Sequence, residues 1–366
     1  MLVLGFLASA ADVGKPMKVD FINAIPAHYQ FWDNLVGAMQ TAAQQLEINF
    51  TNDVAVKPEE MVSEVTRLVN GPDRPDYLIL SMHGTSHTTL LKIAEDAKVP
   101  VFVINAGLLE EDKKQYGGPR EHFKYWIGQM LPDEERAGYD LARTLLDRAE
   151  ESGKSLPGGS LEIMALGGRE EDFPAVLRLA GLGRAVANDH AAALERIVPA
   201  NWSQDEAKAR TPLILERFPN TKVIWAANDA MALGVLAALE ELGRHPGEDI
   251  FVGGIDWDDD AVKAVADGKL TATVGGHFMD GAWALVLLYD YHHGIDFASE
   301  RTDWLSKMLP LTKETAKEYL NTFGVGNWRK VDFRSFSKSY NSGLKKYDFS
   351  LNKVLLDLKA AKKGEP

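Results

Sequence analysis

Short apolar runs alternate with amphipathic stretches along most of the chain, and this pattern indicates the elements of its fold. The run Lys18–Asn23 is a candidate buried strand. In the next stretch, Phe31–Leu46, apolar side chains recur at the spacing of one face of an α-helix. Strands and helices that alternate in this way form βαβ units around a mostly parallel sheet. The pattern therefore predicts the α/β class.

The alternation continues in two successive series, which predicts two doubly wound lobes, each with its own parallel sheet. The predicted strands of the first series are Lys18–Asn23, Asp76–Met82, Val99–Asn105 and Tyr125–Gly128, and its helices are Phe31–Leu46, Thr88–Asp96 and Glu134–Glu150. After a Gly- and Ser-rich loop at 152–159, the predicted strands are Leu161–Leu166, Ala185–Asp189, Val223–Ala227, Ile250–Ile255 and Ala272–Gly275, and the helices are Phe173–Leu182, Gln204–Arg217, Ala230–Leu242 and Met279–Tyr291.

The chain is predicted to cross between the two lobes more than once. We assign residues 16–128 and 276–308 to an N-terminal lobe, and residues 129–275 and 309–330 to a C-terminal lobe. The crossings predict a hinge of several strands near Trp126–Gln129, Val274–His277 and Met308–Thr312. Residues 331–366 form a Lys-rich C-terminal extension with no predicted role. Because parallel sheets bind ligands at the carboxyl ends of their strands, we expect a ligand in the cleft between the lobes.

The first residues have the pattern of a secretory signal. An apolar run, LVLGFL, precedes Ala8-Ser9-Ala10, the small-residue pattern at which signal peptides are cleaved. We therefore interpret residues 1–10 as the remnant of a signal peptide and expect an exported, periplasmic protein. The alternative is an apolar N-terminus with no targeting role. No later stretch approaches the ~18–20 consecutive apolar residues of a membrane span.

Composition and charge exclude several classes of function. The 366 residues include 53 Asp and Glu against 40 Lys and Arg, for a net charge of −13. Nucleic acids and anionic membranes are therefore poor candidate partners, since both attract positive charge. The chain contains no cysteine, which excludes disulfides, thiolate metal sites and a cysteine nucleophile.

Motifs for catalysis, cofactors and metals are missing from the sequence. The DWDDD segment lacks the Gly and Glu of a calcium-binding EF-hand loop, and we interpret Asp258–Asp260 as the solvated N-terminus of a helix. His83 and His87 flank a Gly-Thr-Ser segment, and no Glu completes a zinc motif. Neither a Walker loop nor a Gly-x-Ser-x-Gly motif occurs. We therefore expect no enzyme, no cofactor and no bound metal.

Two segments in the second half of the chain carry a resemblance to a known family. The first is WAANDAMALGVLAALEELGRHPGEDIFVGGIDW, from Trp225 to Trp257, with an Asn-Asp-x-Met-Ala-Leu-Gly core and a strand that ends in Asp256. The second is DGKLTATV, from Asp267 to Val274. Over residues 17–325 the chain resembles the type 1 periplasmic sugar-binding proteins that serve ABC importers, the ribose-, galactose- and autoinducer-binding group. The resemblance implies two lobes, a multi-strand hinge and a sugar bound between them.

The resemblance implies ligand-binding residues at strand ends of the first lobe. Phe31 and Trp32 stand where the family has aromatic rings, which pack on the apolar C–H faces of a sugar. Asn105 ends the strand that begins Pro-Val, where the family often has an acid or an amide. Phe31 could instead belong to the core.

In the second lobe the resemblance implies a hydrogen-bonding set. Arg178, three residues before Gly181, matches the family's Arg, and Asp256 matches its strand-end Asp. Charged groups form the stronger hydrogen bonds, so we expect Arg178 and Asp256 to contribute most to the discrimination between one ligand and another. Asn228 matches the family's Asn, although it could simply cap the following helix. Further candidates are His277 and two possible stacking surfaces that could instead be packing residues, Trp202 and Trp257.

Three departures from the family pattern bear on the ligand. Ala106 stands where ribose binders have Arg, and Gly276, followed by His277, stands where the hinge strand has Gln. The loop Asn23–Gln30 is longer and brings His28 and Tyr29. The missing Arg and Gln remove contacts to hydroxyl groups, which argues against ribose itself.

The resulting prediction is a monomeric periplasmic protein that captures a sugar or related polyol by hinge closure, without chemistry, and delivers it to an ABC permease. The alternative is a ligand-binding receptor subunit for a membrane sensor kinase or chemoreceptor. A repressor of the lactose-repressor type would need a DNA-binding headpiece, and few residues precede the first predicted strand. A sugar-modifying enzyme would need a paired acid and base, for which His277 with Asp256 is the pair to examine.

Overall fold

The structure is a computed structural model, and it describes residues 16–23, 29–82, 86–153, 160–324 and 326–364. The chain divides into two compact units, each assembled from separate segments. Unit 1 comprises Met1–Leu131, Met279–Ser306 and Gly326–Val354, and unit 2 comprises Pro132–Phe278, Lys307–Val325 and Leu355–Pro366. The proposed signal remnant at 1–10, His28 and His83 lie outside the described residues.

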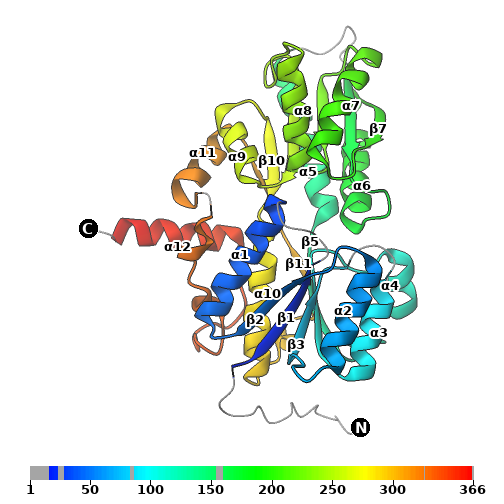
Figure 1. The fold of residues 1–366 in the computed structure, drawn as a ribbon. Helices are drawn as coiled ribbons and strands as arrows, with labels where there is room; N and C mark the ends of the chain where they lie inside the picture. The colour runs from blue at the N-terminus through cyan, green and yellow to red at the C-terminus, as the bar shows by residue number, and fades with distance from the viewer. Residues whose placement is uncertain (1–15, 24–28, 83–85, 154–159, 325, 365–366) are drawn as a thin grey trace. The chain divides into compact units, whose positions relative to one another are not determined.

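Unit 1 is built on a six-stranded sheet with the order β2-β1-β3-β4-β5-β11, in which β1 to β5 are parallel. Its strands are β1 (Lys18–Asn23), β2 (Asn49–Val54), β3 (Tyr77–Leu80), β4 (Val101–Ile104), β5 (Trp126–Pro132) and β11 (Asp303–Ser306), and its helices are α1 (Gln30–Gln45), α2 (Pro58–Asn70), α3 (His87–Ala97), α4 (Glu110–Tyr116) and α10 (Asp280–His292). Helices α1 and α10 pack together on one face of the sheet, and α2 and α3 pack on the other (Figure 1). Because both faces are covered, β3 and β4 are buried at every position.

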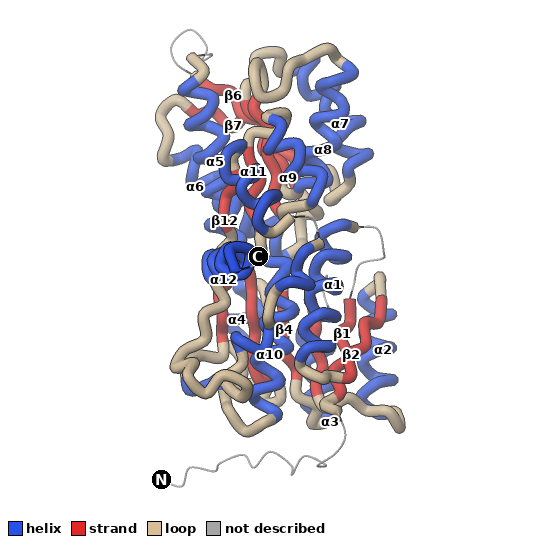
Figure 2. The backbone as a smooth tube through the Cα atoms, turned by 90° about the vertical axis from the view of Figure 1, so that its left-hand side faces the viewer, coloured by secondary structure: helices blue, strands red, loops and turns tan. Residues whose placement is uncertain are grey.

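Unit 2 repeats this design with the order β7-β6-β8-β9-β10-β12, in which β12 is antiparallel to β10. Its strands are β6 (Leu161–Gly167), β7 (Ala192–Pro199), β8 (Val223–Ala226), β9 (Phe251–Asp256), β10 (Ala272–Gly275) and β12 (Leu309–Leu311), and its helices are α5 (Glu134–Glu151), α6 (Phe173–Ala187), α7 (Gln204–Arg217), α8 (Asp229–Glu241), α9 (Asp259–Asp267) and α11 (Lys313–Thr322). Helices α5 and α6 cover one face of this sheet, and α7 and α8 cover the other (Figure 2). The predicted α/β class with two doubly wound parallel sheets is confirmed.

Two glycines allow α5 and α6 to cross in close contact. A Cβ atom at Gly138 of α5 would overlap the backbone carbonyl of Arg178, and one at Gly181 of α6 would overlap the carbonyl of Glu135. Any larger residue would force the helices apart. The close crossing brings the first turn of α5 beside Arg178 on α6.

Residues 326–354, the first part of the C-terminal extension, pack on α1 and α10 in unit 1. Asp290 on α10 is fully buried and holds this segment. Its carboxylate accepts hydrogen bonds from the Ser337 hydroxyl (2.6 Å), the backbone N–H groups of Lys338 (2.7 Å) and Ser339 (3.0 Å), and the Tyr347 hydroxyl (2.8 Å). The extension ends in α12 (Leu351–Gly364), whose Lys359 pairs with Glu318 of α11.

The structure overturns two details of the sequence interpretation. The segment Ala185–Asp189, which we expected to be a strand, is the end of α6 and its cap, and the strand lies later, at β7. Asp258, which we expected in a solvated helix terminus, is buried at the N-cap of α9. Among the described residues, no helix is both long enough and apolar enough to cross a membrane.

Candidate functional site

Four of the predicted site residues converge at the carboxyl edge of the unit 2 sheet. Asp256 is the last residue of β9, His277 follows β10, Asn228 follows β8, and Arg178 reaches this edge from α6. A hydrogen bond joins Arg178 Nη1 to Asp256 Oδ1 (3.1 Å), and His277 Nε2 lies 3.4 Å from Arg178 Nη2. Strands of a parallel sheet present ligand-binding groups at this edge. The topology thus brings together residues up to a hundred positions apart in the sequence.

Arg178 is the centre of the group and is only 4% exposed. Its Nη1 also donates to the backbone carbonyl of Ala227 (2.7 Å). Burial opposes the positive charge of Arg178, but the carboxylates of Glu134 and Asp256 outweigh this effect and raise its pKa. The guanidinium therefore stays charged. It also lies over the ring of Trp202, with its central carbon 5.8 Å from the ring centroid.

Glu134 also belongs to this group of buried residues, although the sequence did not single it out. It opens α5, is 1% exposed and forms a two-point ion pair with Arg178, Oε2 to Nε (2.6 Å) and Oε1 to Nη2 (3.2 Å). Burial raises the pKa of Glu134, and the neighbouring Arg178 counteracts that rise. A first-turn Glu is common in helices, so the sequence alone did not distinguish Glu134 from its partly exposed neighbour Glu135.

Asp256 is buried and has an unusual backbone conformation, with a positive φ angle. Its φ is 139° and that of Trp257 is 63°, values that non-glycine residues rarely adopt. Burial raises the pKa of Asp256 to about 8, with further upward contributions from Asp229 and Glu134 that Arg178 partly offsets. Its Oδ1 accepts the bond from Arg178, and its Oδ2 accepts none from the residues that the structure describes. Asp256 therefore has an oxygen free to accept a ligand hydroxyl.

His277 is buried and neutral. Burial and the nearby Arg178 charge lower its pKa well below the usual value, so its Nε2 can accept from Arg178 Nη2. Its 3.6 Å approach to Asp256 Oδ1 is consequently no ion pair. Gly276, which stands where the family has Gln, has a φ of 106°, and this conformation favours glycine.

Asn228 and Asp229 organise the backbone around the group. Asn228 Oδ1 accepts from the Met231 N–H (2.9 Å), which is the capping role that the sequence left open, and its Nδ2 donates to the Trp202 carbonyl (3.4 Å). Asp229 is fully buried and accepts from the Thr273 hydroxyl (2.8 Å) and from the Asp258 N–H (2.9 Å). Burial raises its pKa to about 7. These bonds tie α8, β10 and the turn after Asp256 together.

The two candidate stacking residues differ in their surroundings. Trp257 is 1% exposed, donates from Nε1 to the Leu309 carbonyl (3.0 Å) and packs on Tyr319 with 4.8 Å between ring centroids. It therefore fills the core of unit 2. Trp202 is half-buried, and its Nε1 donates to Asp172 Oδ2 (2.7 Å). Trp202, beside Arg178, is the better placed of the two to present a ring to a ligand.

The predicted residues of unit 1 lie in the segments that follow β1 and β4. Phe31 and Trp32 occupy the first turn of α1, after β1, and their rings meet edge to face with centroids 5.3 Å apart. Asn105 follows β4 with a left-handed φ of 62°, a conformation that Asn tolerates well. All three side chains are largely buried.

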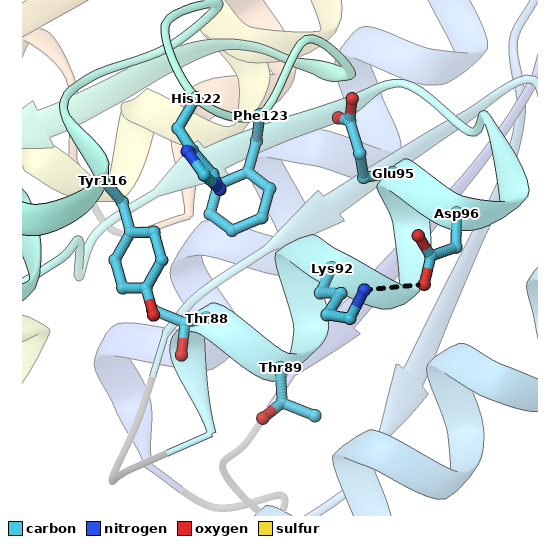
Figure 3. A pocket seen from close by; sticks show the side chains of 8 residues that line it. All are labelled: Thr88, Thr89, Lys92, Glu95, Asp96, Tyr116, His122 and Phe123. Atoms are coloured by element: carbon cyan, nitrogen blue, oxygen red, sulfur yellow. Dashed lines mark hydrogen bonds and ion pairs between the residues drawn. The ribbon is translucent and has the colours of Figure 1, made fainter.

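A pocket of about 250 Å³ elsewhere in unit 1 is lined by none of these residues. It lies beside α3, where Lys92 pairs with Asp96 (3.2 Å), and the rings of Tyr116, His122 and Phe123 also line it (Figure 3). Among the described residues, no group of three or more His, Asp or Glu side chains is arranged to hold a metal ion.

Comparisons with known proteins identify the family. Residues 19–294 match the family model of the periplasmic binding protein domain. The chain is 30% identical over 292 residues to the D-apiose import binding protein of Actinobacillus succinogenes, a match that covers 79% of this chain and 86% of the relative. It is 26% identical over 222 residues to a galactofuranose-binding protein of Escherichia coli, which covers 60% of this chain and 64% of that relative.

Solved structures give the same result. The crystal structure of a periplasmic sugar-binding protein from Pseudomonas fluorescens matches with a TM-score of 0.82 and 32% identity, covering 93% of this chain and 99% of the other. That match extends well beyond the part of the chain covered by the family model. The chain belongs to the periplasmic binding protein family, in its type 1 sugar-binding group.

Proposed function

We propose that this protein captures a sugar or related polyol in the periplasm, by hinge closure, and delivers it to an ABC importer. The observation that carries the proposal is the buried pair of Arg178 and Asp256 at the carboxyl edge of unit 2, with Asp256 Oδ2 left to accept from a hydroxyl group. Membership of the family supports it. The names of relatives, such as the D-apiose import binding protein, favour an importer over a membrane sensor as the partner.

The proposed capture involves no chemical step. In unit 1, Phe31 and Trp32 supply aromatic surface for the apolar faces of a sugar ring, and Asn105 supplies a polar group at a strand end. The pair that an acid–base reaction would need, His277 and Asp256, is poorly suited to it, because His277 is buried, neutral and directed at Arg178.

A thermal-unfolding screen of the purified protein tests this proposal. The panel contains pentoses, hexoses, furanosides, disaccharides and polyols. At about a hundredfold above its dissociation constant, the true ligand stabilises the protein by roughly 2.7 kcal/mol, a clear rise in Tm. A panel in which no compound raises the Tm would contradict the proposal.

Two substitutions locate the site in the same assay. We expect Asp256→Ala to remove the ligand-induced rise in Tm while the variant still unfolds cooperatively. The matched control is Asp260→Ala, because Asp260 is exposed on α9 and pairs with Lys263 (2.9 Å) at the surface. It should keep the full rise. Retention of the rise in Asp256→Ala would show that the ligand binds elsewhere.

A further inference from the structure

The chain passes between unit 1 and unit 2 at several places, and the last of them falls inside a helix. The crossings come after residues 131, 278, 306, 325 and 354. The final crossing divides α12, whose first residues, Leu351–Val354, belong to unit 1 and whose remaining residues belong to unit 2. One continuous helix therefore joins the two units. The match to the family model ends at residue 294, well before this helix.

The start of α12 is held firmly in unit 1. Leu351 and Val354 are 8% and 2% exposed. Just before the helix, Phe349 stacks on Trp283 of α10, with ring centroids 5.2 Å apart. The buried carboxylate of Asp290 holds the same segment through the hydrogen bonds described above. This end of the helix is thus fixed to the core of its unit.

The attachment of α12 in unit 2 depends on two neighbouring residues. Leu358 is 7% exposed, although it lies in the part of the helix that follows the crossing. Lys359 pairs with Glu318 of α11, and their side chains are 43% and 60% exposed. An exposed ion pair stabilises a structure little, whereas burial of a leucine side chain contributes more. Leu358 should therefore supply most of the attachment.

We propose that α12 is a strap, a helix whose second half docks on unit 2 through Leu358 and limits how far the two units can swing apart. This inference rests on the proposed capture by hinge closure and adds a control to it. The helix contains no Pro, and its one Gly is its last residue, so it has no ready point at which to bend. Four residues separate Val354 from Leu358, a rise of about 6 Å along the helix. While both ends are attached, the strap is a short and stiff connection.

The physics of a cross-link gives the direction of the effect. A cross-link acts mainly on the more variable of two states, because it removes conformations that only that state has. In a protein that closes by a hinge, the open form covers a range of orientations, and the closed form is a single arrangement around the ligand. The attached strap therefore shifts the equilibrium toward the closed form, which is the form that binds. Release of the strap should lower affinity.

A leucine pair on α12 supplies a test variant and its matched control. Leu358→Ala weakens the attachment, and Leu356→Ala changes a side chain of the same helix that is 63% exposed. Because the chain contains no cysteine, two introduced cysteines take spin labels at defined places. Suitable positions are Glu111→Cys on α4 in unit 1 and Glu216→Cys on α7 in unit 2, both of which are exposed. Pulsed electron spin resonance then gives the distribution of distances between the labels, and calorimetric titration gives the affinity.

For Leu358→Ala without ligand we expect a broader distribution of distances than in the unmodified protein. Its affinity for the compound found in the thermal screen should fall by about threefold to tenfold. Leu356→Ala should match the unmodified protein in both measurements. Lys359→Glu should have a smaller effect in the same direction, and addition of Glu318→Lys should reverse it, because the double variant restores an ion pair of opposite polarity. This pair of variants also serves if Leu358→Ala does not fold.

An unchanged distribution of distances in folded Leu358→Ala would overturn the inference. Unchanged or tighter binding by this variant would overturn it as well, since the attached strap would then not favour closure. Either result would leave sugar capture intact. The distances are measured without ligand, so the strap is tested even if no compound of the panel binds, and that outcome would contradict the proposed function alone.

Discussion

Two consecutive residues at the end of β9, Asp256 and Trp257, have positive φ angles. Such conformations cost about 1–3 kcal/mol each for non-glycine residues, and they persist only where the surroundings hold them. Here Trp257 is held by the Leu309 carbonyl, and the next residue, Asp258, donates its N–H to Asp229. The consequence is a carboxyl group with one oxygen on Arg178 and the other without a hydrogen-bond partner among the residues that the structure describes. Backbone outliers of this kind cluster at ligand-binding and active sites, which is consistent with the candidate site at the end of β9.

The buried carboxyl of Asp256 should make stability depend on pH. Burial raises its pKa from 3.8 to about 8 in the folded state. An acid whose folded pKa is raised stabilises the fold fully below its unfolded pKa and loses that contribution as pH rises through the folded pKa. We therefore compare the free energy of unfolding of the ligand-free protein with that of Asp256→Asn. Relative to this variant, it should fall by at most about 1.4 kcal/mol per pH unit between roughly pH 4 and 8.

Urea unfolding of both proteins at several pH values from 5 to 9 measures this difference. Asp260→Asn, a change at an exposed carboxyl of α9, is the control and should follow the unmodified protein. Parallel pH profiles for Asp256→Asn and the unmodified protein would mean that Asp256 ionises normally in the folded state.

At the scale of elements, the close crossing of α5 and α6 sets the geometry of the site. Glu134 lies one turn before Gly138 on α5, and Arg178 lies three residues before Gly181 on α6. We expect Gly138→Ala to force the helices apart, to cost about 1–3 kcal/mol of the free energy of unfolding and to weaken ligand binding by disturbing the Glu134–Arg178 pair.

Gly183→Ala is the matched control on α6. A Cβ atom at Gly183 meets nothing within 4 Å, so this change should stabilise the protein by about 0.5–1 kcal/mol through helix propensity and leave affinity unchanged. Chemical unfolding and calorimetric titration measure both effects. Normal stability and normal affinity in Gly138→Ala would show that the helices can separate without consequence.

The buried elements of the fold were predictable from the sequence, and the edge elements were not. Strands such as β1 and β8 are short apolar runs covered on both faces, which leave a clear signal. The edge strands β2 and β7 are half-exposed and carry polar side chains, so they gave no apolar run to recognise. The strand expected at Ala185–Asp189 therefore falls in the end of α6 and its cap, while the polar edge strand β7 follows it.

The site was predictable to a similar degree. Arg178, Asn228, Asp256 and His277 stand at strand ends or match family motifs, and the structure brings them together. Glu134 was not predictable, because its role depends on a helix crossing that no local pattern encodes. The core position of Trp257 likewise depends on Leu309 and Tyr319, which follow it by more than fifty residues.

At the scale of the molecule, the C-terminal extension is part of unit 1 as far as Val354. Its aromatic residues pack on Trp283 of α10, namely Phe333, Phe336 and Phe349. Gln45 of α1 adds hydrogen bonds to the backbone of Val331 (2.9 Å) and Phe333 (2.7 Å). The extension thus completes the apolar covering of α1 and α10.

Loss of the Asp290 carboxylate should release this segment. We expect Asp290→Asn to cost about 3 kcal/mol, because several buried donors lose a charged acceptor. Tyr347→Phe removes one of these bonds and should cost about 1.5–3 kcal/mol. Limited proteolysis and thermal unfolding measure the effect, with Asp73→Asn, at an exposed carboxyl of unit 1, as the control. Unchanged protease resistance in Asp290→Asn would contradict this role.

The interleaving of the two units has a consequence for the order of folding during synthesis. Leu35 and Met39 of α1 lie beside Gly281 of α10, and α10, β11 and the extension are all made after the continuous segment that forms most of unit 2. The apolar face of α1 therefore stays uncovered until α10 is made, whereas the continuous segment of unit 2 can begin to fold before then. The part of the chain that leaves the ribosome first therefore cannot complete its own packing until segments from the last quarter of the chain are made, and its apolar face is open to aggregation until then.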